Sequence, residues 1–316
     1  MDDLAQKLDA LLRTRRRGDA EFGGACHVGG ERTDLDRVRL FWSEHSTHRS
    51  ASVADEGLVF LLSGRKIGYL GERQFTYDAD RCLVVSAALP YEYSAVASPE
   101  SPLLGLFVRL DLAELGELAA ALDRHPSTNP RPAEPTLGLS TVPLDSTLRD
   151  VLRRLLDCLS SARDCEVLGP GLLRELNYRV LTSPGGEGLR ALTLQDTSHA
   201  RIVRLLADVK RDVAVHHSVE ELARSVGMSQ TVFHRAFRKL TGESPISYIK
   251  KLRLHHAGTL ILYDALSVSD AARRVGYRSP TQFSREFKRL FGHPPSSLRA
   301  QRPLSSHAPE TSVSAH

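Results

Sequence analysis

Two stretches of the chain carry polar side chains of the types that bond to the edges of DNA bases. Arginine can form two hydrogen bonds with guanine, glutamine can bond adenine, and the threonine methyl packs on the methyl of thymine. The first stretch holds Gln230, Thr231, His234, Arg235 and Arg238, and the second holds Thr281, Gln282, Arg285, Lys288 and Arg289. This chemistry predicts recognition of double-stranded DNA through its major groove.

The two stretches belong to an internal repeat. Residues 218–227 align with residues 267–276 at an offset of 49 positions. After one extra residue in the second copy, residues 231–242 align with residues 281–292 at an offset of 50. Each copy contains two short segments of helical pattern joined at a glycine, so the repeat predicts two paired-helix units.

Capping residues and apolar spacing predict how these helices begin and pack. Ser218 and Glu221 fit a capping box, and Ser267 with Asp270 is the counterpart in the second copy. One apolar face is shared by Val219, Leu222, Ala223, Phe233 and Phe237 in the first copy and by Val268, Ala271, Ala272, Phe283 and Phe287 in the second. We therefore expect recognition helices over about residues 230–241 and 280–291, with their polar faces outward.

Residues 245–263, between the copies, predict one longer helix with Ile246, Ile249, Leu252 and Leu260 on its apolar positions. Nineteen residues at ~1.5 Å each span ~28 Å. Successive major grooves on one face of DNA are ~34 Å apart. The helix length is therefore compatible with holding both recognition helices against the same face of the duplex.

Residues 58–110 predict a set of short strands instead. Six segments rich in β-branched and aromatic residues are separated by turn residues: 58–62, 66–70, 74–77, 82–85, 91–93 and 103–110. Such spacing is typical of a small antiparallel barrel or sandwich. Apolar residues at helical spacing follow, and the leucine stripe from Leu148 to Leu159 fits either a domain core or a dimer seam.

The last hundred residues before the tail strongly resemble the DNA-binding domain of AraC/XylS regulators. The resemblance rests on Glu221-Leu-Ala, Val226-Gly-Met-Ser229, Phe233-His-Arg-Ala-Phe-Arg238, Gly242-Glu-Ser-Pro245, Arg253-Leu, Ala271-Ala, Val275-Gly-Tyr277, residues 282–292 and Pro294-Pro295. It implies that the side chains reaching base edges are Thr231, His234 and Arg235 in the first unit and Thr281, Gln282 and Arg285 in the second.

The first half is similar to the N-terminal domain of AraC-type regulators over residues 58–66, Leu83-Val-Val-Ser86, Leu89-Pro90 and Arg109-Leu-Asp111. The resemblance implies an α+β protein, with an N-terminal cupin-like antiparallel β-barrel followed by helices and an all-α C-terminal domain of two helix-turn-helix units joined by a linker helix. It also implies a small effector at the barrel and a homodimer formed through helices. The segment before residue 58 departs from the family pattern.

Charge is divided unevenly along the chain. Residues 199–302 hold 19 Lys and Arg against 8 Asp and Glu, a balance of +11, whereas the rest holds 23 against 30, a balance of −7. A basic block on an acidic body is typical of a polyanion-binding module joined to another domain. We expect an effector-binding and dimerisation domain over 1–190, with helices at about 145–182, a DNA-binding domain over 191–302, and a disordered tail over 303–316.

These observations favour a transcription regulator controlled by a small effector, and both an activator and a repressor fit the sequence. The expected partners are promoter DNA, RNA polymerase, the effector and a second copy of the chain; no cofactor, no catalysis and no membrane are expected. The N-terminus lacks a signal-peptide pattern and no apolar run reaches membrane length, which favours the bacterial cytoplasm, with association to the nucleoid on DNA. Two alternatives stay open: a cupin-type enzyme with an accessory DNA-binding domain, and a regulator whose barrel binds no ligand.

Three weaker signals accompany this hypothesis. His45 and His48 are candidate metal ligands, but residues 58–86 contain no histidine of the kind that a metal cupin supplies, so a metal site is disfavoured. Cys158 and Cys165 are better explained as buried thiols than as a redox pair. A set of aromatic residues fits either a pocket or a core: Trp42, Tyr69, Phe75, Tyr77, Tyr91 and Tyr93.

Overall fold

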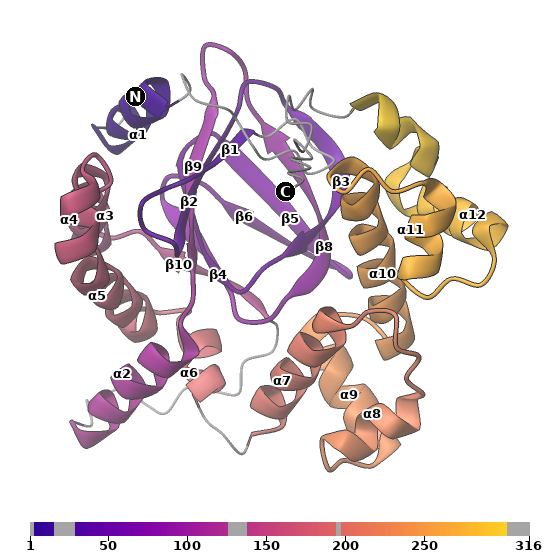
Figure 1. Ribbon diagram of the computed structural model, residues 1–316. Helices are drawn as coiled ribbons and strands as arrows, with labels where there is room; N and C mark the ends of the chain where they lie inside the picture. Colours follow the sequence, from indigo (N-terminus) through magenta and orange to yellow (C-terminus); the bar gives the residue numbers. More distant parts are fainter. Residues whose placement is uncertain (1–2, 16–28, 126–137, 194–196, 302–316) are drawn as a thin grey trace, which may run out of the picture.

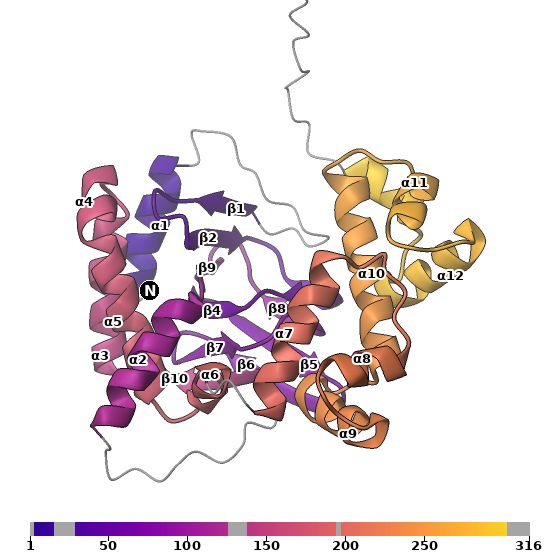
Figure 2. The ribbon, with the colours of Figure 1, turned by 60° about the horizontal axis from the view of Figure 1, so that its bottom comes forward.

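A computed structural model describes residues 3–15, 29–125, 138–193 and 197–301. The chain builds a β-rich N-terminal domain and a helical C-terminal domain, which lie side by side in Figures 1 and 2. The fold is therefore mixed α+β, as expected. The tail over residues 303–316, expected to be disordered, lies outside the described residues.

Ten strands of the described residues form two antiparallel sheets. The six-stranded sheet has the order β1–β2–β9–β4–β7–β10, and the four-stranded sheet has the order β3–β8–β5–β6. The strands are β1 (Gly29–Arg32), β2 (Val38–Ser43), β3 (Thr47–Ala54), β4 (Gly57–Ser63), β5 (Arg65–Leu70), β6 (Arg73–Tyr77), β7 (Arg81–Val85), β8 (Leu89–Val96), β9 (Leu103–Arg109) and β10 (Leu139–Pro143). Within the described part of the chain, no strand pair joins the two sheets.

Strands β4 to β9 coincide with the six segments expected between residues 58 and 110. Alternation explains them: in β5, Lys66, Gly68 and Leu70 are buried, whereas the residues between them are only partly so. Strands β1, β2, β3 and β10 were not expected. The sequence of β3, THRSASVA, holds few apolar residues, so its pattern is weak.

Helices of the N-terminal domain flank the six-stranded sheet, and all of them except α6 lie on the side away from the C-terminal domain in Figure 1. They are α1 (Asp3–Arg15), α2 (Leu112–Arg124), α3 (Ser146–Cys158), α4 (Ala162–Val167), α5 (Gly169–Thr182) and α6 (Glu187–Thr193). The leucine stripe of α3 is fully buried, with Leu148, Leu152 and Leu155 each 0% exposed in one core with Phe60 of the sheet. The stripe is therefore domain core, which decides between the two expectations for it.

The C-terminal domain consists of helices throughout its described length. They are α7 (Ser198–Arg211), α8 (Val219–Ser225), α9 (Gln230–Thr241), α10 (Pro245–Leu262), α11 (Val268–Arg274), α12 (Pro280–Phe291) and the 3₁₀ helix η1 (Pro295–Gln301). Among the described helices, none is long and apolar enough to cross a membrane.

A continuous apolar core joins the two domains. Leu83 and Val85 of β7 belong to the same buried cluster as Leu206 of α7 and Tyr248 of α10. Three hydrogen bonds among the described residues cross the junction, one of them from the Lys210 ammonium of α7 to the Asp55 carboxylate at 2.6 Å. The Tyr248 hydroxyl donates to the carbonyl oxygen of Ala88 at 2.6 Å, and the Gly138 amide donates to that of Leu240 at 2.9 Å. The helical domain is thus docked on the β-rich domain through α7, α9 and α10.

Candidate nucleic-acid interface

The first paired-helix unit consists of α8 and α9. The Ser218 hydroxyl accepts a hydrogen bond from the Glu221 amide at 3.1 Å, and the Glu221 carboxylate accepts one from the Ser218 amide at 2.8 Å. This is the expected capping box, which satisfies two helix-end amides at once. Gly227 has a φ of 65°, the left-handed conformation that glycine adopts without strain, so the chain turns sharply before α9.

The second unit repeats this construction in α11 and α12. The Ser267 hydroxyl caps α11 by accepting from the Asp270 amide at 3.0 Å, and Gly276 has a φ of 88° in the turn. Pro280 occupies the first turn of α12, where its missing amide costs no helical hydrogen bond. Helices α9 and α12 have the bounds expected for the recognition helices.

Phenylalanines hold each pair of helices together. Phe233 and Phe237 of α9 are 0% and 2% exposed with ring centroids 5.4 Å apart, and Phe283 and Phe287 of α12 are 0% and 1% exposed at 5.5 Å. Burying such side chains contributes roughly 1.5–3 kcal/mol each. Because they fix the inner face, they also decide which side chains of α9 and α12 point outward.

The outward faces carry all ten of the side chains singled out by the sequence, and every one is exposed. Helix α9 presents Gln230, Thr231, His234, Arg235 and Arg238, and helix α12 presents Thr281, Gln282, Arg285, Lys288 and Arg289. The structure therefore places these residues on two matching surfaces of a repeated unit.

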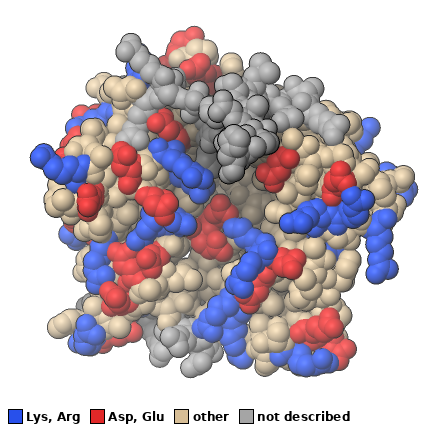
Figure 3. All heavy atoms as spheres, viewed as in Figure 1, with Lys and Arg blue, Asp and Glu red and all other residues tan. Residues whose placement is uncertain are grey.

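The positively charged side chains on these faces are not neutralised by neighbouring carboxylates in the described part of the chain. Among the described residues, none of the following forms an ion pair with a carboxylate within 4 Å: Arg235, Arg238, Arg285, Lys288 and Arg289. By contrast, Arg224 on α8 is bonded to Glu220 at 2.7 Å. Figure 3 shows Lys and Arg side chains projecting at the edge where α11 and α12 lie in Figure 1. Unpaired surface cations of this kind suit phosphate or base contacts.

One acidic residue of α12, Glu286, was not singled out by the sequence. Its carboxylate accepts hydrogen bonds from Lys250 at 2.8 Å, from the Tyr277 hydroxyl at 2.8 Å and from the Gln282 amide nitrogen at 3.2 Å. Burial raises the pKa of Glu286, but these three bonds outweigh it and the net pKa lies below its usual range. The Gln282–Glu286 spacing of four was visible in the sequence, whereas the contact with Lys250 was not.

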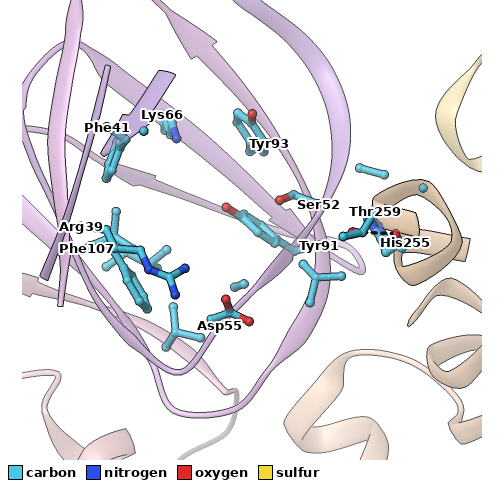
Figure 4. Close-up of a pocket in the computed structure, with 18 of the residues that line it drawn as sticks. Arg39, Phe41, Ser52, Asp55, Lys66, Tyr91, Tyr93, Phe107, His255 and Thr259 are labelled. Atoms are coloured by element: carbon cyan, nitrogen blue, oxygen red, sulfur yellow. Dashed lines mark hydrogen bonds between the residues drawn. The ribbon is translucent and has the colours of Figure 1, made fainter. Parts of the chain in front are cut away.

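A pocket of about 420 Å³ lies between the two domains. Its walls come from strands of both sheets and, on one side, from α10 and α12. Figure 4 shows His255 and Thr259 of α10 facing Tyr91, with Lys66, Phe41 and Tyr93 together at one end. Of the aromatic residues named by the sequence, Tyr77, Tyr91 and Tyr93 line this pocket and Trp42, Tyr69 and Phe75 do not.

Two polar side chains of the pocket escaped the sequence reasoning. The Lys66 ammonium is 4.9 Å from the centroid of Phe41 and 4.8 Å from that of Tyr93, and the residue is only 8% exposed. The Nε2 atom of His255 is buried and has no hydrogen-bond partner among the described residues, and burial lowers the pKa of this histidine to about 3. Alternation along β5 could have placed Lys66 inward, but no local pattern marks His255.

The weaker sequence signals do not build a further site. In the described part of the chain, no group of three or more His, Cys, Asp or Glu is arranged to hold a metal ion, and this covers His45 and His48. Cys158 and Cys165 are buried reduced thiols, and the Cys165 thiol donates to the backbone carbonyl oxygen of Cys158 at 3.3 Å.

Both domains match known families. The AraC-type transcriptional regulator N-terminus matches residues 34–188, and the helix-turn-helix domain matches residues 222–301. The first match runs from just before β2 to the start of α6, and the second covers the paired-helix units from Leu222 of α8 onward. They confirm the two resemblances that the sequence motifs indicated.

Individual relatives agree with these matches. The lactose operon transcription activator of Staphylococcus xylosus is 36% identical over 76 residues, which cover 24% of this chain and 27% of the relative. The chain spans between 27% and 45% of the length of four such curated relatives. The thermoregulatory protein LcrF of Yersinia pestis is 27% identical over 271 residues, which cover 84% of this chain and 96% of LcrF.

Among solved structures, unsaturated fatty acid-bound ToxT from Vibrio cholerae shares the fold. Its TM-score is 0.57 at 12% identity, and the match covers 86% of this chain and 97% of ToxT. The same succession of β-rich domain and helical domain therefore occurs in both proteins. Given the matches of its two domains and the repeated helix-turn-helix geometry, the chain belongs to the AraC family of DNA-binding transcription regulators.

Proposed function

We propose that the protein binds promoter DNA by placing α9 and α12 in two major grooves. The observation that carries this proposal is the matched pair of exposed polar faces, whose five cations lack ion pairs among the described residues. Base edges are read by Thr231, His234, Arg235, Thr281, Gln282 and Arg285. Gln230, Arg238, Lys288 and Arg289 flank them and contact bases or phosphates.

The site on DNA is asymmetric in this proposal. The two faces are chemically unlike, because His234 of α9 has the neutral Ser284 as its counterpart in α12 and Gln282 replaces the apolar Val232. The connecting helix α10 has 18 residues and is about 27 Å long. One protomer therefore reads two different half-sites on one face of the duplex, about one helical turn apart.

Selection of DNA from a random library by the full-length protein tests this proposal. We expect an extended, non-palindromic consensus. A variant carrying both Arg235→Ala and Arg285→Ala should enrich no consensus although it folds, and Arg65→Ala, at the exposed first position of β5, is the matched control. Enrichment of the same consensus by the double variant would contradict the proposal.

We also propose which function each of the two domains performs. Residues 1–190, with helices at about 145–182, form the effector and dimerisation domain, and residues 191–302 form the DNA-binding domain. The pocket is the effector site, because α10 and α12 make one of its walls and an occupant would touch the helices that carry the DNA-binding faces. Effector binding would then change the equilibrium between DNA-binding states.

A metabolite screen by thermal shift on the full-length protein tests the effector site. A true effector raises the melting temperature of the unmodified protein. Ser52→Trp, which fills the pocket from β3, should abolish that shift, whereas Ser50→Trp on the same strand but outside the pocket lining should not. A shift that survives Ser52→Trp would place the effector elsewhere, and absence of any hit would favour a regulator without a ligand.

Finer aspects of the regulator rest on its relatives. Several are named activators, so we propose that this protein activates transcription through RNA polymerase in the cytoplasm and acts by binding rather than catalysis.

A homodimer would not use the buried leucine stripe of α3. Val167 and Leu168, 70% and 54% exposed at the C-terminal end of α4, are better placed, and Val167→Asp with Leu168→Asp should then yield monomers in sedimentation.

A further inference from the structure

Glu286 is the only acidic residue in α12, and it is not free to meet DNA. Its side chain is 13% exposed, and its three hydrogen-bond donors come from α10 (Lys250), from the turn before α12 (Tyr277) and from α12 itself (Gln282). A carboxylate turned toward phosphates would be repelled by them. Held inward against Lys250, it can instead act on its neighbour in the same helix.

We infer that Glu286 is a positioning residue that fixes which edge of the Gln282 amide faces the DNA. This inference rests on the proposed function of α12. An ionised carboxylate only accepts hydrogen bonds, so the edge of Gln282 that faces Glu286 must be the NH₂ group. The amide carbonyl oxygen then points away from the carboxylate. The structure has this arrangement, with Gln282 Nε2 3.2 Å from Glu286 Oε1.

Base preference follows from the fixed amide. In the major groove, adenine and cytosine present amino donors, whereas guanine and thymine present carbonyl acceptors at the corresponding positions. A carbonyl oxygen facing outward accepts from an amino group. Gln282 should therefore select adenine or cytosine at its position and disfavour guanine and thymine. A glutamine without the hydrogen bond to Glu286 could flip its side-chain amide. It could then bond either the amino donors of adenine and cytosine or the carbonyl acceptors of guanine and thymine.

Lys250 and Tyr277 keep the carboxylate still. The Tyr277 hydroxyl reaches Oε2 while Lys250 and Gln282 share Oε1, so both oxygens are committed. Tyr277 is itself packed on Phe283, with centroids 5.3 Å apart. The network thus connects the linker helix, the phenylalanine core and a base-reading side chain, and it has no counterpart in α9, where Ala236 occupies the position equivalent to Glu286.

Glu286→Gln tests the inference, because it is isosteric but its amide can donate as well as accept. Full-length unmodified protein, Glu286→Gln and Gln282→Ala are passed through selection from a random DNA library in parallel. The position whose preference disappears in Gln282→Ala is the one that Gln282 reads. There the unmodified protein should favour adenine or cytosine, and in Glu286→Gln that preference should fall by roughly tenfold. Preferences at other positions should persist.

Two further variants separate positioning from charge and folding. Tyr277→Phe keeps the charge of Glu286 but removes one restraint, so it should relax the same position by a smaller factor. Glu243→Gln breaks a comparable ion pair with Lys251, 2.8 Å long, that touches no base-reading residue, and it should leave every base preference unchanged. Because the readout is a preference among sequences, a general gain in affinity from removing a negative charge does not mimic the effect.

Three results would overturn the inference: an unchanged preference in Glu286→Gln, a preference for guanine or thymine in the unmodified protein, or a Gln282→Ala variant that alters no position. In each case the consensus read by Arg235 and Arg285 would remain, so the proposed binding of DNA through α9 and α12 would stand. Failure of the unmodified protein to select any sequence would instead remove both.

Discussion

The hydroxyl of Tyr248 in α10 donates a hydrogen bond of 2.6 Å to the carbonyl oxygen of Ala88, and the whole tyrosine side chain is buried between the two domains. Burial raises the pKa of Tyr248 and keeps the hydroxyl protonated, so it remains a donor. The linker helix that spaces the two recognition helices is therefore attached directly to the β-rich domain. Helix α10 is thus one of the direct connections between the domain junction and the DNA-binding unit.

Tyr248→Phe should destabilise the docked protein. The substitution leaves the buried Ala88 carbonyl oxygen without its donor, which costs about 1–3 kcal/mol in the free energy of unfolding. Chemical denaturation of the full-length protein measures this loss. Tyr178→Phe is the control, because Tyr178 is 37% exposed and its hydroxyl makes no hydrogen bond within the described residues. Equal stability of the two variants would show that the Tyr248 bond contributes nothing to docking.

Stability should depend on pH through His255. Burial first, and then the positive charge of Lys251, lower the pKa of His255 to about 3 in the folded protein. In the unfolded chain the value is about 6.5. Between these values the unfolded state binds a proton that the folded state does not, so stability is fully present above pH 6.5 and falls as the pH drops, by up to about 1.4 kcal/mol per pH unit.

His255→Phe removes this titration and keeps a ring against Phe291, whose centroid is 4.9 Å from that of His255. From pH 7 to pH 5, unmodified protein should lose ~1–2 kcal/mol more unfolding free energy than the variant. Urea denaturation at the two pH values gives the comparison. If the unmodified protein and the variant lose equal amounts of unfolding free energy, His255 is as well solvated in the folded protein as in the unfolded chain.

Arg235→Ala and Arg285→Ala should each weaken binding to the selected site by ~1–3 kcal/mol while binding to random DNA falls much less. The reason is that a bidentate guanine contact carries sequence information, whereas a phosphate contact does not. Fluorescence anisotropy with both kinds of DNA, at one salt concentration, gives the ratio of the affinity for the selected site to the affinity for random DNA. Equal losses on both would reassign these arginines to the phosphate backbone.

Salt should weaken binding steeply. If all five unpaired cations of α9 and α12 release counterions, the slope of log K against log salt is roughly −4.5, and each of Lys288→Gln and Arg289→Gln should reduce its size by about 1 if that residue contacts phosphate. Titrations between low and high salt give the slopes. A slope that neither variant alters would show that these two residues remain in solvent on the complex.

The sequence foresaw most of the C-terminal domain because its signals are local. Capping serines, turn glycines and phenylalanines at helical spacing act within about twenty residues, and the bounds of α9 and α12 followed from them. The strand pattern of β4 to β9 is local in the same sense. Strand β3 was missed because its residues are mostly polar or small, and its place is set by pairing with β8.

The pocket and the docking contacts could not be foreseen in this way. Lys66, His255 and the Tyr248–Ala88 bond depend on how the two domains meet, and the partners lie up to 160 positions apart. No periodic pattern of residues in the sequence indicates such a contact. Glu286 is an intermediate case, because its spacing from Gln282 is local, whereas its bond to Lys250 of α10 crosses 36 positions and arises only when α10 packs on α12.

Hydroxyl-radical footprinting of the full-length protein on its selected site tests the central claim most directly. The account predicts two protected segments on one face of the duplex, with centres about one helical turn or ~34 Å apart. Arg235→Ala should weaken protection of one segment and Arg285→Ala protection of the other, because α9 and α12 occupy different grooves. Loss of the same segment in both variants, or a single short footprint for the unmodified protein, would contradict reading by two helices.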